Sequence, residues 1–296
     1  MTVPRGNILA VAEIEVREAA LADLPQIAAV ALATGQDEEW GGADPAYMTH
    51  LLAHGRVVVG VAGGSVAGFG ATRPLGSGPD AVSMLCDLFV HPEVHGSGCG
   101  RAMLGALWQG TRGHRMTFSS LHAHALPLYT SFGLDAWWPL LYLRGRVDAL
   151  AAPAGWQAAA ASPASVAAAE LSWTGVDRSA DHQAWARRPG GAGVLAVRDG
   201  EVMAAGTVGG AGDEFGVTHL AVTPAADDVR AAAAVLAVLA GLAPEDGVAR
   251  VCLPAPHPAV RPLLAAGWRA GEFDLFMATE PGLLDPCRAV PSPALA

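Results

Sequence analysis

The two halves of the 296-residue chain repeat one hydrophobic pattern. The segment Leu88-Phe-Val-His-Pro92 recurs 132 positions later as Leu220-Ala-Val-Thr-Pro224. Further along, Thr130-Ser-Phe-Gly-Leu134 recurs as Leu264-Ala-Ala-Gly-Trp268, with the two glycines 134 positions apart. Self-similarity at a nearly fixed offset is the sequence sign of a duplicated structural unit. The pattern predicts two related lobes in tandem; a chance likeness between two α/β patterns is the alternative.

Each lobe is expected to mix strands with helices, because the hydrophobic period switches between two residues and 3.6 residues along the first half. Asp23 is expected to cap a helix over residues 24–34, and Asp44-Pro45 to begin a helix that stops at Gly55. Strands are expected at 14–18, 56–61, 66–73, 82–90, 116–122 and 137–143, with a short helix at 126–132. The expected fold class is therefore α/β (α+β), each lobe a mixed, mostly antiparallel sheet flanked by helices.

Composition also suggests where one lobe ends. Residues 151–168 are rich in alanine, proline and serine and carry no charge, which is typical of a linker. The expected domains are an N-terminal lobe at 1–150, the linker at 151–168, and a C-terminal lobe with a tail at 169–296.

Charge and hydropathy exclude several classes of protein. Hydrophobic residues make up 52% of the chain and charged residues 16%, too apolar a composition for a disordered chain. The net charge of −10 argues against a nucleic-acid partner. The longest aliphatic run, 231–244, is too short to cross a bilayer, and no signal peptide is recognised. We expect a cytoplasmic protein without a membrane partner.

No metal site is expected from the sequence. The four cysteines are scattered without a C-x-x-C pair. The histidine pairs His50/His54 and His122/His124 each lack a third ligand at a recognisable spacing.

The segment that carries chemistry is a strand, a glycine-dense turn and a helix that begins near Gly100. Such a turn leaves several backbone N–H groups pointing one way at the positive end of a helix, which makes an anion site suited to a pyrophosphate. Glycines keep side chains out of the phosphate's way. The chain lacks the G-K-[ST] of a P-loop. The turn also lies too late in its lobe for a Rossmann fingerprint.

The turn reads His95-Gly-Ser-Gly98-Cys-Gly100 after Leu88, Val90 and Pro92. With these residues the sequence resembles the GNAT superfamily of acetyl-CoA-dependent N-acetyltransferases, whose turn is usually written Q/R-x-x-G-x-G/A. A second element, Ala125-Leu-Pro-Leu-Tyr129-Thr-Ser-Phe-Gly133-Leu134, is similar to the family's A-x-x-x-Y-x-x-x-G-F. Residues 14–145 match one complete unit of the family in element order. His95 replaces the usual Arg or Gln, and His122 replaces a frequent Asn.

The resemblance implies a cofactor site and one catalytic residue. The main chain at 88–90 would hold the pantetheine arm of acetyl-CoA, and the amides at 96–101 would hold its pyrophosphate. Tyr129 would protonate the departing CoA thiolate, although a tyrosine that only packs is the alternative. The predicted cofactor-binding residues are Leu88, Phe89, Val90, His95, Gly96, Ser97, Gly98, Cys99, Gly100, Arg101 and His122.

N-acetylation also needs a proton acceptor, because an amine with a pKa of about 10 is protonated at neutral pH. Asp87 is the candidate base, acting through water, because it interrupts an apolar strand just before the cofactor segment. An ordinary hydrogen-bonded or ion-paired aspartate is the alternative. The acidic run Asp37-Glu38-Glu39-Trp40 is a candidate contact for a cationic acceptor, or a solvated charge run.

The sequence therefore predicts an N-acetyltransferase that acts on a primary amine of a small molecule or peptide, as a monomer or homodimer. Its C-terminal lobe has Asp227, Asp228 and Arg230 where the first has His95, Gly96 and Gly98, so it is not expected to bind acetyl-CoA. The alternative is a non-catalytic acyl-CoA-binding sensor or interaction module.

Overall fold

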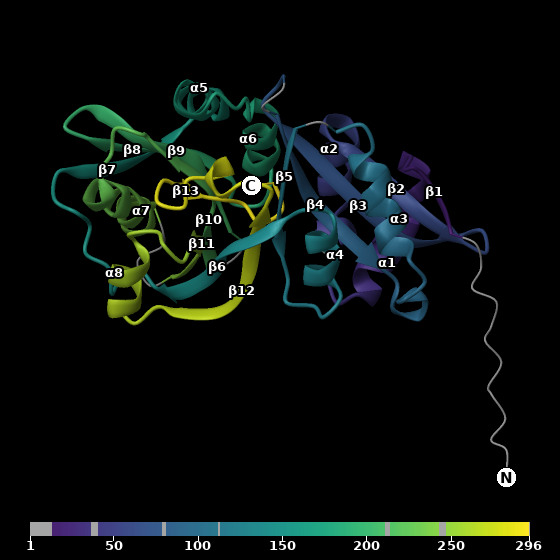
Figure 1. Cartoon of the computed structure of the whole chain (residues 1–296). Coiled ribbons are helices and arrows are strands. Elements are labelled where there is room, and N and C mark those ends of the chain that lie inside the picture. The colour runs from purple at the N-terminus through teal and green to yellow at the C-terminus, as the bar shows by residue number, and fades with distance from the viewer. Residues whose placement is uncertain are drawn as a thin grey trace, which may run out of the picture. The chain divides into compact units, whose positions relative to one another are not determined.

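The computed structural model describes residues 14–36, 41–78, 81–111, 113–210, 214–242 and 247–295 (Figure 1). The chain divides into two compact units, and each is described by itself. Unit 1 comprises Met1–Arg73 and Leu85–Thr111, and unit 2 comprises Pro74–Met84 and Arg112–Ala296.

Unit 1 is a sheet of neighbouring strands in the order β1-β2-β3-β4, with three α-helices. The β1–β2 and β2–β3 pairs are antiparallel. The largest fully buried side chains of this unit include those of Phe69, Met48 and Met103. The elements are β1 (Glu15–Glu18), η1 (Leu21–Asp23), α1 (Leu24–Ala33), η2 (Gly41–Ala43), α2 (Pro45–His54), β2 (Arg56–Ala62), β3 (Ser65–Leu75), β4 (Val82–Val90), η3 (Pro92–Val94) and α3 (Cys99–Trp108).

The two predicted helix starts in unit 1 differ in outcome. Asp44 caps α2 as predicted, since its carboxylate accepts a hydrogen bond from the Ala46 amide at 2.8 Å. Asp23 lies at the N-cap position of α1 as predicted, but its side chain makes no capping hydrogen bond to that helix. A 3-10 turn directly precedes α1, so the Asp23 carboxylate bonds backward, to the Ala20 amide and the Arg17 guanidinium.

Unit 2 contains one sheet in the order β5-β12-β6-β11-β10-β9-β8-β7, and β13 pairs with β10. Its elements are β5 (His114–Ser119), α4 (Ala125–Ser131), β6 (Asp135–Arg146), β7 (Trp156–Ala161), α5 (Pro163–Thr174), α6 (Ser179–Ala186), β8 (Ala192–Arg198), β9 (Glu201–Gly209), β10 (Glu214–Val222), α7 (Asp228–Leu242), β11 (Val248–Pro254), α8 (Val260–Ala265), β12 (Arg269–Ala278), η4 (Pro281–Leu283) and β13 (Ala289–Val290).

The element order confirms two lobes in tandem. Leaving 3-10 turns aside, the first lobe runs β1-α1-α2-β2-β3-β4-α3-β5-α4-β6, and the second runs β7-α5-α6-β8-β9-β10-α7-β11-α8-β12. Strand by strand and helix by helix the two sequences of elements are the same. β4 and β10 are both nine residues long and begin 132 positions apart, which is the offset of the sequence repeat.

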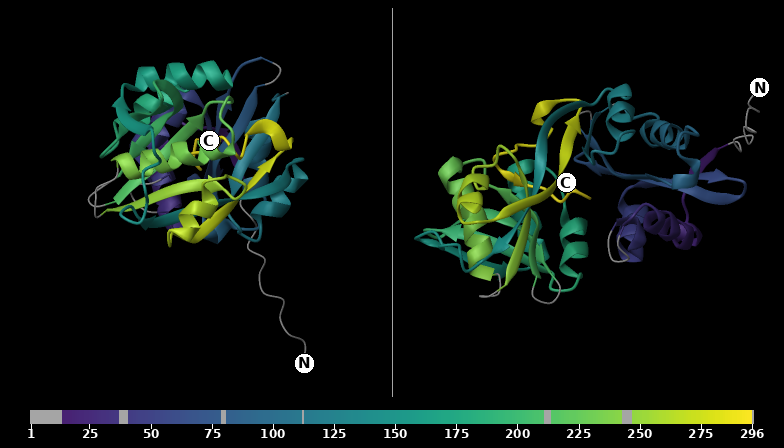
Figure 2. Two further views of the ribbon diagram at one scale, coloured as in Figure 1. Left: turned by 90° about the vertical axis from the view of Figure 1, so that its left-hand side faces the viewer. Right: turned by 90° about the horizontal axis from the view of Figure 1, so that it is seen from below.

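The two lobes exchange their last strands within unit 2. β5 of the first lobe pairs with β12, the last strand of the second lobe, whereas β11 of the second lobe pairs with β6, the last strand of the first. β6 and β12 also pair with each other, antiparallel, and lie side by side in teal and yellow (Figures 1 and 2). In each lobe the fifth strand, β5 or β11, therefore pairs with the last strand of the other lobe, β12 or β6.

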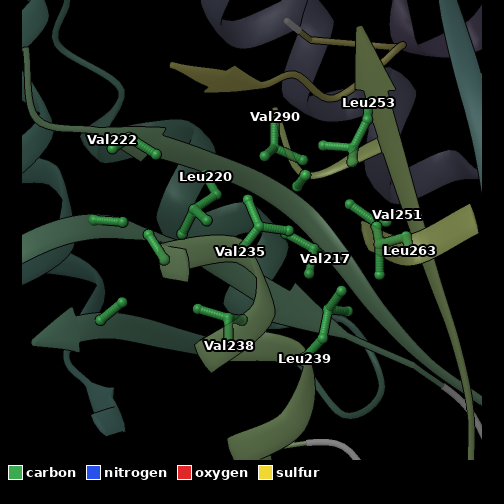
Figure 3. Close-up of a cluster of buried hydrophobic side chains, with 14 of the residues drawn as sticks. Val217, Leu220, Val222, Val235, Val238, Leu239, Val251, Leu253, Leu263 and Val290 are labelled. Atoms are coloured by element: carbon green, nitrogen blue, oxygen red, sulfur yellow. The ribbon is translucent and has the colours of Figure 1, made fainter. Parts of the chain in front are cut away.

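The hydrophobic core of unit 2 lies between α7 and the sheet. Val235, Val238 and Leu239 of α7 face side chains of β10 and β11, among them Leu220 and Val251 (Figure 3). These five side chains are at most 1% exposed, so α7 is fixed to the sheet by apolar burial.

The stretch predicted as a linker contributes regular structure. β7 and the first residues of α5 lie within 151–168, and β7 pairs antiparallel with β8. The domain boundaries at 150 and 169 stay a prediction. None of the described helices is long and apolar enough to span a bilayer.

Candidate functional site

The glycine-dense turn of unit 1 forms a cradle of backbone amides, residues 95–101, between β4 and α3. Gly96 and Gly98 have φ values of +80° and +87°, a region that glycine enters without a steric cost. A Cβ at either position would meet no atom within 4 Å. The amide N–H groups of Gly96, Gly98 and Gly100 donate no hydrogen bond to any of the described residues. The turn thus presents unpaired N–H groups to open space at the start of a helix, as an anion site requires.

Cys99 begins α3 with its thiol turned away from open space. The side chain is buried, and a Cβ placed on Gly60 would lie 2.6 Å from its sulfur. Burial raises the pKa of the Cys99 thiol, so the residue is a poor nucleophile. Because its side chain is buried, Cys99 could bind an anion only through its main-chain amide.

His95 lies at the mouth of the cradle and bonds to the end of β4. Its Nε2 is 2.8 Å from the carbonyl oxygen of Val90. The His91 amide donates to Ala67 of β3, so strand alternation turns the main-chain groups of Leu88 and Val90 away from β3. An extended ligand arm that pairs with this side of β4 would meet the His95 ring at the Val90 carbonyl.

Asp87 sits inside unit 1, three residues before the end of β4. Its side chain accepts a hydrogen bond of 2.6 Å from the hydroxyl of Tyr47 on α2, and Asp87 is 6% exposed. Burial raises the pKa of Asp87 to about 6, and the Tyr47 hydrogen bond opposes that rise. An aspartate with this pKa is ionised for the most part at neutral pH and can still accept a proton.

Tyr47 is a functional candidate that the sequence analysis did not identify. It is separated from Asp87 by 40 positions, so no local spacing links the two residues. The one available signal was the helix start at Asp44-Pro45, which fixes where Tyr47 lies on α2.

Of the predicted site residues, unit 1 brings together Asp87, the 88–90 strand end and the 95–101 cradle. The other two belong to unit 2: His122 is exposed in the turn before α4, and Tyr129 is buried on α4. The acidic run Asp37-Glu38-Glu39-Trp40 lies outside the described residues.

The corresponding turn of the second lobe is built differently. Only residues 223–227 separate β10 from α7, whereas residues 91–98 separate β4 from α3. The shorter turn holds no glycine. The Asp227 carboxylate accepts a hydrogen bond of 2.8 Å from the Arg230 amide. A carboxylate thus occupies the place where an anion would bind.

The second lobe carries a buried polar cluster of Glu170, His182, His219 and Arg178. Glu170 accepts hydrogen bonds from His182 Nε2 at 2.7 Å and His219 Nε2 at 2.9 Å. Arg178 Nε lies 3.0 Å from the same carboxylate. Burial raises the pKa of Glu170, but the two imidazoles and Arg178 outweigh it and hold that pKa well below its usual range. Burial lowers the pKa of His219.

Glu170, His182 and His219 have donor atoms close enough to hold a metal ion. The carboxylate already accepts from both rings, however, and a dication there would lie beside the Arg178 guanidinium in a buried, low-dielectric setting. The arrangement favours a hydrogen-bonded ion network over a metal centre, and the absence of a metal stays a prediction.

One protein-family model matches part of the chain. Residues 53–133 match the model of the acetyltransferase (GNAT) domain. This match contains β4, the cradle and Tyr129. No curated protein sequence matches the chain.

Solved structures share the fold over nearly the whole chain. A candidate acetyltransferase from Pyrococcus horikoshii is 14% identical, with a TM-score of 0.66, over 100% of this chain and 99% of that one. A tandem GNAT protein from the clavulanic acid biosynthesis pathway is 18% identical, with a TM-score of 0.61, over 92% and 100%. A GCN5-related N-acetyltransferase from Anabaena variabilis is 14% identical, with a TM-score of 0.64, over 90% and 72%.

The Glu170 cluster gives a prediction for stability against pH. The pKa of Glu170 is lower in the folded chain than in the unfolded chain, so its contribution is complete above about pH 4.5 and is lost as pH falls. Glu170→Gln should lower the free energy of unfolding at pH 7 by about 3 kcal/mol, because the buried Arg178 loses the carboxylate 3.0 Å from its Nε and keeps Asp181 at 3.8 Å. It should also remove part of the acid sensitivity below pH 4.5.

Glu214→Gln is the matched control, because Glu214 pairs with Arg144 and Arg250 at the surface of the same unit. Its cost should stay below about 1 kcal/mol. Thermal unfolding of the wild type and both variants from pH 7 to pH 3.5 checks this. Equal losses in the two variants would contradict the role given to Glu170.

Proposed function

We propose that this chain, in which residues 53–133 match the model of the GNAT acetyltransferase domain, transfers an acetyl group from acetyl-CoA to the primary amine of a small molecule or a peptide. The observation that carries the proposal is the cradle, whose glycine amides face open space directly after β4. Acetyl-CoA supplies the activated thioester, and the protein has to align the amine with it and stabilise the oxyanion.

The residues of unit 1 fit the cofactor's two main features. The amides of Gly96, Gly98 and Gly100 would hold the pyrophosphate, where a Cβ on Gly96 or Gly98 would intrude. The main-chain groups of Leu88 and Val90 would pair with the pantetheine arm, and the Val90 amide would polarise the acetyl carbonyl. For the arm to bind the Val90 carbonyl, the hydrogen bond between His95 Nε2 and that oxygen would have to break, or the oxygen would have to accept both bonds. Ser97, Cys99 and Arg101 complete the turn around the diphosphate.

Two side chains would move protons. Asp87 would take the proton of the acceptor ammonium through water, since its raised pKa of about 6 suits a base near neutral pH. Tyr129 would give a proton to the CoA thiolate as the C–S bond breaks. His122 would contact CoA from the turn before α4. The family match includes Tyr129 and supports its role.

The same reasoning assigns the cofactor to the first lobe. Asp227 in the second lobe's turn would repel a diphosphate, and its carboxylate already caps α7 through the Arg230 amide. The second lobe would therefore serve as a scaffold that supplies β12 to the first. We propose a cytoplasmic enzyme, since none of the four cysteines is in a disulfide. We propose that it is monomeric or homodimeric.

A non-catalytic acyl-CoA sensor is the second candidate, favoured by one observation. The His95 ring occupies the Val90 carbonyl, so the chain could bind an acyl-CoA without the alignment that turnover requires.

Gly98 gives the first test of the cradle. Gly98→Ala should raise the Kd for acetyl-CoA at least about tenfold, because the methyl group projects toward the diphosphate and displaces a charge-assisted hydrogen bond. Gly110→Ala is the matched control: Gly110 also has a positive φ, +78°, and open space around its Cβ, but lies beyond α3. Both variants should lose about 1–2 kcal/mol of stability.

Isothermal titration calorimetry with acetyl-CoA measures the difference. The proposal requires one site per wild-type chain, weakened in Gly98→Ala and kept in Gly110→Ala. Equal affinity in the two variants would show that the diphosphate binds elsewhere.

Tyr129 separates the enzyme from the sensor. Tyr129→Phe should lower the rate of thiol release by about 100-fold with an amine that the wild type acetylates, while the Kd for acetyl-CoA stays within twofold. A panel of primary amines assayed for free thiol provides the measurement. Unchanged turnover would remove Tyr129 from the mechanism, and a wild type that releases no thiol with any amine would favour the sensor.

A further inference from the structure

Asp87 and Tyr47 form a buried hydrogen-bonded pair inside unit 1. The tyrosine hydroxyl donates to Oδ2 of the carboxylate at 2.6 Å, and the two residues are 6% and 7% exposed. Within the described part of the chain, Tyr47 is the partner that the structure gives to Asp87. The second oxygen, Oδ1, is thus left for another donor.

Tyr47 is held in place by the start of its helix. Asp44 caps α2 through the Ala46 amide, and Pro45 occupies the first turn. The next residues along the buried face, Met48 and Leu51, have no exposed surface. The backbone of Tyr47 is therefore fixed before any ligand binds, so the Tyr47 hydroxyl is already in position to donate to the Asp87 carboxylate.

The second lobe has a closed polar cluster at the corresponding position. At the offset of 132 residues, His219 of β10 takes the place of Asp87 of β4. His219 is held by Glu170, and Trp185 stacks on its ring with centroids 5.3 Å apart. Both lobes thus place a buried polar group at this point of the sheet. In the first lobe this group is the Asp87 carboxylate, of which one oxygen, Oδ2, accepts a hydrogen bond from Tyr47.

We infer that Tyr47 is a positioning residue of the proposed acetyl transfer: it engages Oδ2 of Asp87, so that Oδ1 faces the acceptor ammonium or an intervening water. The inference rests on the proposed function. The ammonium gives one proton to Oδ1, which leaves a neutral amine and a neutral carboxyl group. The amine nitrogen then forms a bond to the acetyl carbon, the C–S bond breaks, and its electron pair leaves on sulfur. The nitrogen's surplus proton ends on the thiolate, and the carboxyl returns its proton to solvent.

The hydrogen bond also decides how readily Asp87 ionises. Burial and the Tyr47 hydroxyl are the two influences on its pKa, and they act in opposite directions; no charged side chain among the described residues contributes. Because the hydroxyl donates to the charged form, removing it should raise the pH at which Asp87 loses its proton.

Tyr47→Phe tests the inference, and Tyr142→Phe is its matched control. Tyr142 donates to the Asp274 carboxylate at 2.5 Å in unit 2, so its variant loses the same atom and the same kind of bond away from the proposed site. Carbon-13 NMR of aspartate carboxyls, with the Asp87 signal assigned by Asp87→Asn, gives the titration of Asp87 directly.

In Tyr47→Phe the Asp87 signal should titrate about one pH unit higher than in wild type. The acid limb of kcat/KM for the best amine of the panel should move by the same amount, with rate lost at pH 6 and recovered at pH 9. The Kd for acetyl-CoA should stay within twofold. Tyr142→Phe should leave the Asp87 titration and the pH profile unchanged.

The double variant Tyr47→Phe/Asp87→Asn distinguishes an effect exerted through Asp87 from a purely structural effect of Tyr47→Phe. If Tyr47 acts through Asp87, Tyr47→Phe should have no further effect on the pH profile in an Asp87→Asn background. An Asp87 titration that is the same in Tyr47→Phe and wild type, or an effect of Tyr47→Phe that persists without Asp87, overturns the inference. A wild type that acetylates no amine overturns the proposed function and the catalytic part of the inference, while the carboxyl titration separately decides whether Tyr47 controls Asp87.

Discussion

The antiparallel pairing of β6 with β12 is the interaction on which unit 2 depends. β6 and β12 lie next to each other in this sheet, and each also pairs with the fifth strand of the other lobe, β6 with β11 and β12 with β5. Strands of the two lobes are therefore joined in one sheet by backbone hydrogen-bond ladders.

The duplicated fold supports different chemistry at equivalent points. One turn between strand and helix holds glycines and open amides, whereas the other holds a carboxylate that caps its own helix. One buried position holds Asp87 with a single donor, and the other holds His219 inside an ion network. In both comparisons the first lobe keeps a polar group available to a ligand, whereas the second has that group already paired. The proposed chemistry would thus be concentrated in one of two lobes with the same element order.

Local chemistry could be predicted from the sequence, and distant partners could not. The cradle glycines and the Asp44 cap are short-range patterns, and the repeat predicted two related lobes in tandem but not β7, which lies in the stretch predicted as a linker. Asp23 begins its helix as predicted, but its carboxylate binds the Arg17 guanidinium and not an amide of that helix, a partner that the sequence pattern did not reveal. The Tyr47–Asp87 pair and the Glu170 cluster join residues from separate elements, which no spacing reveals. The strand exchange was not predictable either, because a hydrophobic strand pattern does not specify its neighbour.

The central claim is that the backbone of the first lobe's turn binds the diphosphate of acetyl-CoA. A crystal structure of the chain with acetyl-CoA tests it most directly. The account predicts diphosphate oxygens within hydrogen-bonding distance of the amides of Gly96, Gly98 and Gly100, and no cofactor at the turn that Asp227 caps. A diphosphate bound at the second lobe's turn, or away from both turns, would contradict it.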